Sequence, residues 1–341
     1  MRILIDILHP AHVHFFAAFH GEMAERGHEL RVASRRKDVT CELLDARRIP
    51  HDPISERRGG QLGLWREARH RLTALDRQAR EFRPHVITGC MGPLAVLAGK
   101  RRRIPTAIFY NNETATQANR VAQRWATAYI TGRSFRGSAG PRHVVHDSYH
   151  ELAYLHPLRF RPDPGTRSEL GVGDDEALIL VRFVSLTSSH DGGVHGVRDR
   201  TAFVAALAER GRVFVSTEDP WDPGWNASPL PALDRMHHAV AAADLVIGES
   251  ATVAAEAAVL GVPSIYVADS PRGYLDDLHD RFGLVRREAD PRAALQAATA
   301  LLTDDSSRAR WAEGRQRMLQ ESPDLTGWMT SFFEDQRWNE R

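Results

Sequence analysis

The apolar positions of this 341-residue chain alternate between two kinds of segment. Short runs with few polar interruptions, such as Ile3–Ile7 and Thr106–Tyr110, are typical of strands that are buried on both faces of a parallel sheet. Between such runs, segments 13–26 and 62–82 carry apolar residues three or four positions apart, which predicts amphipathic helices. Strands separated by helices indicate the α/β class with doubly wound parallel sheets.

One break in this pattern divides the chain. Segment 156–165, HPLRFRPDPG, contains three prolines and a glycine, which disfavour helix and strand alike, so we expect a linker there. We therefore expect an N-terminal Rossmann-like domain over 1–160 and a C-terminal one over 161–325. The remaining residues, 326–341, are rich in aromatic side chains and suit a terminal helix that packs back on the N-terminal domain.

Composition narrows the function classes. With 42% apolar and 26% charged residues and no run near the roughly 18 apolar residues of a membrane span, the sequence predicts a soluble protein without an integral membrane segment. A strand at the start of the chain leaves no room for a secretory signal, and two cysteines cannot form a disulfide framework. We expect a cytoplasmic protein. A net charge of +1 argues against nucleic acid as a partner, and the basic run Lys100–Arg103 is interpreted as a solvated loop.

The most informative segment is 244–267, DLVIGESATVAAEAAVLGVPSIYV, which predicts a buried strand, a tight turn, a helix and a second strand. Gly248 permits a sharp turn, and Ser250 or Thr252 can cap the helix. The N–H groups of the first helical turn attract anions, and the carboxylate of Glu256 near this terminus can accept sugar hydroxyls. The alternative is a βαβ unit that binds nothing.

Two such domains, with LHPAHVHFFAAF after the first strand and GESATVAAEAAVLGVP late in the second half, resemble the GT-B glycosyltransferase architecture. The resemblance implies two facing Rossmann-like domains with an interdomain cleft. More narrowly, the sequence resembles the prokaryotic domain-of-unknown-function 354 family, which is similar to the peptidoglycan N-acetylglucosaminyltransferase and to the UDP-N-acetylglucosamine 2-epimerases. The segments that carry this resemblance are IDILHPAHVHFF, YNNETATQANR, ELAYLHPLRFRPDP, ILVRFVS with the following SSHD, and GESATVAAEAAVLGVP.

The resemblance implies a donor site in the second domain. Arg182 matches the arginine that GT-B enzymes place on the donor diphosphate, and Glu256 matches the helix carboxylate that binds the ribose hydroxyls. An alternative for Arg182 is a surface ion pair. The other residues expected in the donor site are His190, Ser216, Thr217, Gly248, Glu249, Ser250, Ala251 and Thr252.

The expected acceptor side lies in the first domain. His12 matches the histidine of a transferase loop and is a candidate general base, and Glu113 is a second candidate for that role. Both residues could instead serve to cap helices. The other residues expected on this side are His9, His14, Asn111 and Asn112. Because the three histidines of this loop share no common face, we expect no metal site there.

These features together predict a metal-independent glycosyltransferase without a cofactor. It would move a sugar, N-acetylglucosamine or a related hexose, from a UDP-sugar to a small-molecule or glycan acceptor. One alternative is an isomerase like the UDP-N-acetylglucosamine 2-epimerases, and another is a non-catalytic protein that binds nucleotide sugars. Incubation with UDP-N-acetylglucosamine alone separates the first two readings, because only an epimerase would convert it.

Overall fold

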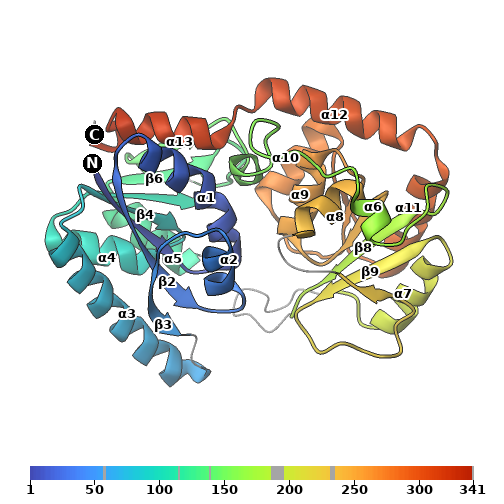
Figure 1. Ribbon diagram of the computed structural model, residues 1–341, viewed down its shortest axis with the longest axis horizontal. Coiled ribbons are helices and arrows are strands. Elements are labelled where there is room, and N and C mark those ends of the chain that lie inside the picture. Colours follow the sequence, from blue (N-terminus) through green and yellow to red (C-terminus); the bar gives the residue numbers. More distant parts are fainter. Residues whose placement is uncertain (57–58, 114–115, 138–139, 186–195, 231–234, 340–341) are drawn as a thin grey trace. The chain divides into compact units, whose positions relative to one another are not determined.

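The structure, a computed structural model, describes residues 1–56, 59–113, 116–137, 140–185, 196–230 and 235–339 (Figure 1). The chain divides into two compact units. Unit 1 consists of Met1–Tyr154 and Pro323–Arg341, and unit 2 consists of Leu155–Ser322. Among the helices of the described ranges, none has the length and apolarity that a membrane span requires.

Unit 1 is built on a parallel sheet whose seven described strands run in the order β3-β2-β1-β4-β5-β6-β7. The strands are β1 (Arg2–Ile7), β2 (Glu29–Arg36), β3 (Asp52–Glu56), β4 (Val86–Cys90), β5 (Thr106–Tyr110), β6 (Ala128–Gly132) and β7 (His143–His146). The helices are α1 (Pro10–Glu25), α2 (Thr40–Ala46), α3 (Gly60–Phe82), α4 (Pro93–Arg102), α5 (Thr116–Trp125) and α13 (Leu325–Glu334), with 3₁₀ turns η1 (His150–Ala153) and η3 (Arg337–Asn339).

Both faces of this sheet are covered by apolar side chains. Ile3 and Ile5 of β1 belong to a cluster with helices α1, α2 and α13, whereas Leu4 belongs to a second cluster with α3, α4 and α5. This arrangement explains why the consecutive residues Ile3, Leu4 and Ile5 of β1 are all apolar. Helix α13 completes the first cluster, where the ring of Phe333 lies 5.0 Å from that of Phe19.

Unit 2 repeats the plan with six described strands in the order β10-β9-β8-β11-β12-β13, all parallel. The strands are β8 (Leu178–Phe183), β9 (Arg212–Thr217), β10 (Ser228–Pro229), β11 (Leu245–Gly248), β12 (Ser264–Tyr266) and β13 (Arg286–Arg287). The helices are α6 (Thr166–Glu169), α7 (Arg200–Ala208), α8 (Met236–Ala242), α9 (Ala251–Leu260), α10 (Gly273–Phe282), α11 (Pro291–Thr303) and α12 (Ser307–Glu321). The predicted class, α/β with two doubly wound parallel sheets, is confirmed.

One local expectation is corrected. The basic run expected in a loop lies mostly in the last turn of α4, where cations are favourable to the helix dipole. There Arg102 pairs with Asp76, and the Lys100 ammonium lies 4.1 Å from the centre of the Trp125 ring. The proline-rich segment 156–165 lies within unit 2. It packs on that unit through Phe160, whose ring centre lies 4.8 Å from the ring centre of His238.

Candidate functional site

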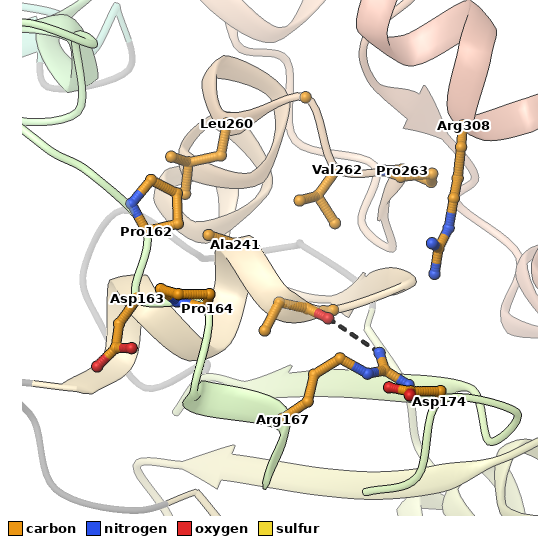
Figure 2. Close-up of a pocket in the computed structure, with 13 residues that line it drawn as sticks. Pro162, Asp163, Pro164, Arg167, Asp174, Ala241, Leu260, Val262, Pro263 and Arg308 are labelled. Atoms are coloured by element: carbon orange, nitrogen blue, oxygen red, sulfur yellow. Dashed lines mark hydrogen bonds between the residues drawn. The ribbon is translucent and has the colours of Figure 1, made fainter. Parts of the chain in front are cut away.

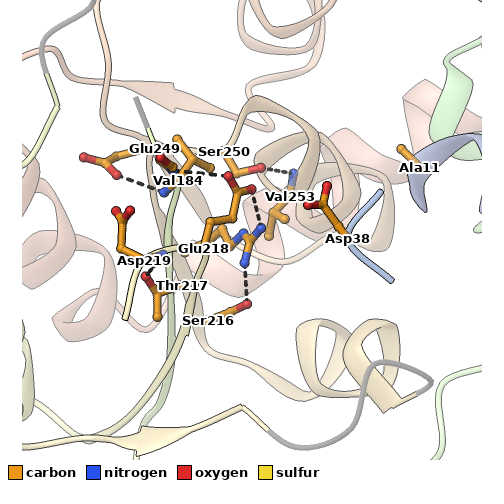
Figure 3. Close-up of polar contacts among 12 residues, drawn as sticks. Ala11, Asp38, Val184, Ser216, Thr217, Glu218, Asp219, Glu249, Ser250 and Val253 are labelled. Carbon is orange, nitrogen blue, oxygen red and sulfur yellow. Dashed lines mark hydrogen bonds and ion pairs between the residues drawn. The ribbon is translucent and has the colours of Figure 1, made fainter. Parts of the chain in front are cut away.

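Three predicted donor residues lie side by side in unit 2. In the strand register, Arg182 of β8 is aligned with Ser216 of β9 on one side and with Gly248 of β11 on the other. Because the strands are parallel, all three residues lie at the carboxyl edge of the sheet, where ligands of doubly wound folds bind. We call Arg182, Ser216, Gly248 and the start of α9 the donor edge. Figure 3 labels Ser216 and Ser250 of this edge.

Gly248 is required where the donor edge turns into α9. Its φ is 151°, and a Cβ there would lie 2.1 Å from the carbonyl oxygen of Arg182. No other residue fits, because the clash is with backbone atoms that cannot move aside. Ser250 rather than Thr252 caps the helix, since its side chain accepts a hydrogen bond of 3.3 Å from Val253 N–H. Ala251 begins the first turn, whose free N–H groups favour an anion.

Arg182 is held at the edge by two neighbours. Its Nη1 donates to Ser216 Oγ at 2.7 Å, and its Nη2 donates to Glu218 Oε1 at 2.7 Å (Figure 3). The second oxygen of Glu218 accepts from Ser185 N–H at 3.2 Å. Arg182 therefore forms the ion pair that was one alternative for it, and it does so at the donor edge. A diphosphate there would compete with Glu218, whose side chain is 46% exposed.

Glu249 was expected to contact the ligand, but its carboxylate is occupied by the protein. The side chain is fully buried and accepts from Val184 N–H at 3.1 Å, Val197 N–H at 2.8 Å and Arg200 Nη2 at 3.0 Å. Burial raises the pKa of this carboxyl, and the three donors oppose that shift. Glu249 thus ties together the chain on both sides of residues 186–195, which include His190 and lie outside the described residues.

Two further donor candidates have partners of their own. Glu256 lies within α9, is buried, and places Oε1 at 3.1 Å from His237 Nε2 of α8. A ribose hydroxyl at this carboxylate would share it with His237, and the ribose contact stays a prediction. Thr217 follows Ser216 in β9, and its hydroxyl accepts from Asp219 N–H at 3.1 Å.

Sequence reasoning missed the charged residues that support this edge. Arg200, at the start of α7, donates to Asp219 at 2.6 Å and to Glu249, and its guanidinium lies 4.7 Å from the centre of the Phe183 ring. Glu218 and Asp219 directly follow the predicted Ser216 and Thr217, so extending that candidate pair by two residues would have found them. Nothing in the sequence pattern marked Arg200.

A pocket of about 590 Å³ lies at the opposite, amino edge of the unit 2 sheet (Figure 2). Arg167 crosses it and donates to the carbonyl of Ala242 at 3.1 Å and to Asp244 at 3.1 Å. The same guanidinium also donates to the carbonyl of Glu176 at 2.6 Å. Arg167 therefore joins chain segments of unit 2, and none of the predicted donor residues lines this pocket.

In unit 1, the predicted histidines occupy the loop between β1 and α1. His9 caps the helix, because its Nδ1 accepts from Ala11 N–H at 3.2 Å. His14 Nδ1 lies 3.0 Å from Arg47 Nη2, and its ring lies 5.5 Å from that of Tyr154. Over the described ranges, no group of three or more histidine, cysteine or acidic side chains is placed to hold a metal ion.

The environment of His12 determines its protonation. Burial lowers its pKa well below the ordinary value, and the nearby His9, His150, Lys37 and Arg71 lower it further. The ring is therefore neutral near pH 7. Its Nδ1 accepts from Leu8 N–H at 3.3 Å, so the one proton of the neutral ring resides on Nε2. In this form His12 offers a hydrogen-bond donor, whereas a general base needs a free lone pair.

The remaining acceptor candidates follow β5. Asn111, Asn112 and Glu113 are half-buried at the carboxyl end of that strand. Glu113 Oε1 accepts from Arg136 N–H at 3.2 Å, in the segment that follows β6. The structure therefore places Glu113 at the same carboxyl edge as the loop of His12, because both follow parallel strands of one sheet.

Two doubly wound parallel sheets, each with polar side chains at its carboxyl edge, define a GT-B-type glycosyltransferase fold. Similar solved structures are the S. aureus MnaA–UDP complex and the spinosyn rhamnosyltransferase SpnG. The first has a TM-score of 0.71 and 11% identity and covers 99% of this chain and 97% of that one. The second has a TM-score of 0.67 and 14% identity, with 98% and 100% covered.

Sequence comparison is more specific than fold. No family model matches the chain. A UDP-N-acetylglucosamine–N-acetylmuramyl-(pentapeptide) pyrophosphoryl-undecaprenol N-acetylglucosamine transferase of Mycobacterium ulcerans is 31% identical over 314 residues, covering 82% of this chain and 74% of the relative. The transferase of the same name from Clavibacter sepedonicus is 29% identical, covering 85% of this chain and 83% of the relative. That of Mycobacterium leprae is 29% identical, with 71% and 61% covered. The chain belongs to this family of N-acetylglucosamine transferases.

Proposed function

We propose that this protein transfers N-acetylglucosamine from UDP-N-acetylglucosamine to an acceptor hydroxyl, without a metal ion or other cofactor. The observation that carries the proposal is the donor edge, where Arg182 lies beside the turn that opens α9. The names of the relatives support the donor, and so does the UDP in the MnaA structure. The acceptor of the relatives is linked to undecaprenol, and we leave the acceptor here as a glycan or small molecule.

In the proposed reaction, an acceptor oxygen forms a bond to the anomeric carbon while the bond from that carbon to the UDP oxygen breaks. The departing diphosphate gains negative charge. Arg182 and the first-turn N–H groups of α9 stabilise this charge, which is the task that a metal ion performs in other transferases. Arg182 must exchange Glu218 for the diphosphate, and Ser216 keeps the guanidinium oriented during that exchange.

The acceptor proton must leave as the new bond forms. We assign the general base to Glu113, because the neutral His12 carries its proton on Nε2 and has its other nitrogen occupied by Leu8. His12 then donates a hydrogen bond to a substrate oxygen and orients it. Glu256 takes the ribose hydroxyls in this proposal, and His190 contacts the donor.

Two finer assignments belong to the same proposal. Membership of the narrower domain-of-unknown-function 354 family is supported by the five segments that resemble it. A cytoplasmic location is supported by Cys41 and Cys90, which are buried free thiols.

Removal of the Arg182 guanidinium tests the donor site. Arg182→Gln should weaken UDP binding roughly 10- to 100-fold in calorimetric titration, because charge-assisted hydrogen bonds to a phosphate are lost. Arg210→Gln, an exposed arginine of the same unit, is the control and should bind UDP like the wild type. Equal affinity in both variants would remove the donor edge from the proposal.

Turnover separates transfer from isomerisation. With UDP-N-acetylglucosamine and a panel of glycan and lipid-linked acceptors, release of UDP should depend on the acceptor. Conversion of UDP-N-acetylglucosamine to its 2-epimer in the absence of any acceptor would overturn the proposed transfer and establish an epimerase.

A further inference from the structure

A second polar site lies in unit 1, next to the loop that contains His12, and none of the residues assigned above lines it. It is a pocket of about 170 Å³ at the carboxyl end of β1, between helices α3 and α4. Its polar lining consists of Asp6, Arg35, Glu67 and Arg71, and its rim is apolar, with Leu64 and Leu94. The proposed reaction uses none of these residues.

The floor of the pocket contains a buried ion pair that is only partly satisfied. Asp6 is 0% exposed and Arg71 is 2% exposed. Arg71 Nη2 donates to Asp6 Oδ1, and Nη1 donates to Ser55 Oγ at 2.7 Å and to the carbonyl of Ser34 at 3.2 Å. Asp6 Oδ2 and Arg71 Nε have no hydrogen-bond partner among the described residues. Buried polar atoms of this kind are costly unless a bound group satisfies them.

The charges of the pocket select for a neutral group. Arg35 pairs with Glu67 through two hydrogen bonds of 2.6 and 2.8 Å, so the four charged side chains form two balanced pairs. An anion would be repelled by Asp6 and a cation by Arg71. Two groups of these ion pairs have no hydrogen-bond partner among the described residues: the acceptor Asp6 Oδ2 and the donor Nε–H of Arg71. Hydroxyl groups satisfy both, because each can donate and accept.

Gly92 packs closely beside the unsatisfied oxygen. A Cβ at this position would lie 3.3 Å from Asp6 Oδ2 and 3.4 Å from the Cβ of Ala95. The φ of Gly92 is −98°, which any residue can adopt, so the backbone does not require glycine here. A side chain at position 92 would therefore crowd Asp6 Oδ2 rather than strain the backbone.

We propose that this pocket is a subsite for a neutral sugar, with one hydroxyl donating to Asp6 Oδ2 and another accepting from Arg71 Nε. Since one water occupies about 30 Å³, the pocket has room for roughly five waters or for one sugar ring. The sugar would be part of the acceptor, so the inference rests on the proposed function, in which unit 1 binds the acceptor.

Gly92→Ala is the decisive variant, because it places a methyl group in close contact with Asp6 Oδ2 and keeps all four charged side chains of the pocket. Methyl α-D-glucopyranoside serves as the probe, titrated by ligand-observed NMR into the full chain. The wild type should bind it, and Gly92→Ala should weaken binding roughly tenfold or more. Gly21→Ala is the matched control, because a Cβ on Gly21 meets no atom within 4 Å, and it should bind the probe like the wild type.

Asp6→Asn provides a second measurement, since it replaces the acceptor carboxylate by an amide of the same shape. It should reduce probe binding in protein whose folding is verified by its thermal transition. Equal probe binding by the wild type and Gly92→Ala, no binding by the wild type, or a probe-soaked crystal with only waters at Asp6 would each overturn the subsite.

Failure of the subsite and failure of the proposed function give different results. If UDP binds and turnover occurs but the probe does not bind, only the subsite is wrong. If the probe binds at Asp6 but no acceptor supports release of UDP, the proposed transfer is wrong and the sugar subsite stands.

Discussion

At the scale of single residues, one backbone contact changes the chemistry assigned to His12. A histidine at the start of a loop after β1 is a natural candidate for a base, because its ordinary pKa lies near neutrality. The Leu8 N–H group occupies Nδ1 and leaves the proton on Nε2. The sequence does not show which of the two ring nitrogens of His12 carries the proton. Glu113 raises no such question, because an ionised carboxylate can only accept hydrogen bonds.

The size of the loss in kcat/KM distinguishes the two candidates. Glu113→Gln should lower kcat/KM by roughly 10²- to 10⁴-fold, because the base is gone. His12→Gln should lower kcat/KM less, since the glutamine amide can still donate a hydrogen bond. His70→Gln, on the exposed face of α3, is the control. A larger loss of kcat/KM in His12→Gln than in Glu113→Gln would reverse the assignment.

At the scale of elements, Glu249 connects three parts of unit 2. Glu249 directly follows β11. Its carboxylate accepts hydrogen bonds from the Val184 N–H after β8, from the Val197 N–H before α7, and from the Arg200 guanidinium at the start of α7. Burying such a carboxylate is favourable only while all three donors are present. Glu249 therefore positions the chain next to Arg182.

Glu249→Gln should lower the free energy of unfolding by about 1–3 kcal/mol, because an amide N–H then faces a donor in a buried position. UDP binding should weaken as well, since the flanks of residues 186–195 lose their common anchor. Glu288→Gln is the control, because its pair with Arg286 is only partly buried and contributes about 1 kcal/mol or less. Urea denaturation measures both variants, and an unchanged midpoint for Glu249→Gln would refute the anchoring role.

Elements with strong patterns could be predicted from the sequence. The strand, the turn and the end of the helix in β11–α9–β12 were recognisable, because Gly248, Gly261 and Pro263 leave few backbone options. The strand β3, DPISE, was not found, since an edge strand with polar ends has no apolar run. The partners of Glu249 were invisible, because Val197 lies 52 positions away and only the folded sheet brings it close.

At the scale of the whole molecule, histidines couple stability to pH. His146 and His150 are packed in unit 1 with their ring centres 6.0 Å apart, and His150 lies 4.6 Å from Phe15. Burial lowers the pKa of His150 to about 3 and lowers that of His146 well below its ordinary value. The folded chain therefore keeps these rings neutral at pH values where the unfolded chain would protonate them.

The sign of the effect follows from linkage. Between the unfolded pKa of about 6.5 and the folded pKa of His150, the unfolded state binds more protons, so stability falls as the pH drops below about 6.5. Below pH 6.5, each such histidine lowers the free energy of unfolding by about 1.4 kcal/mol per pH unit, which amounts to about 2 kcal/mol at pH 5. His150→Phe keeps the aromatic packing and removes the titration, so its free energy of unfolding, measured in urea at pH 7.5 and pH 5, should fall less than that of the wild type. The exposed His70→Gln should behave like the wild type, and an equal loss in His150→Phe would show that His150 is not kept neutral by burial.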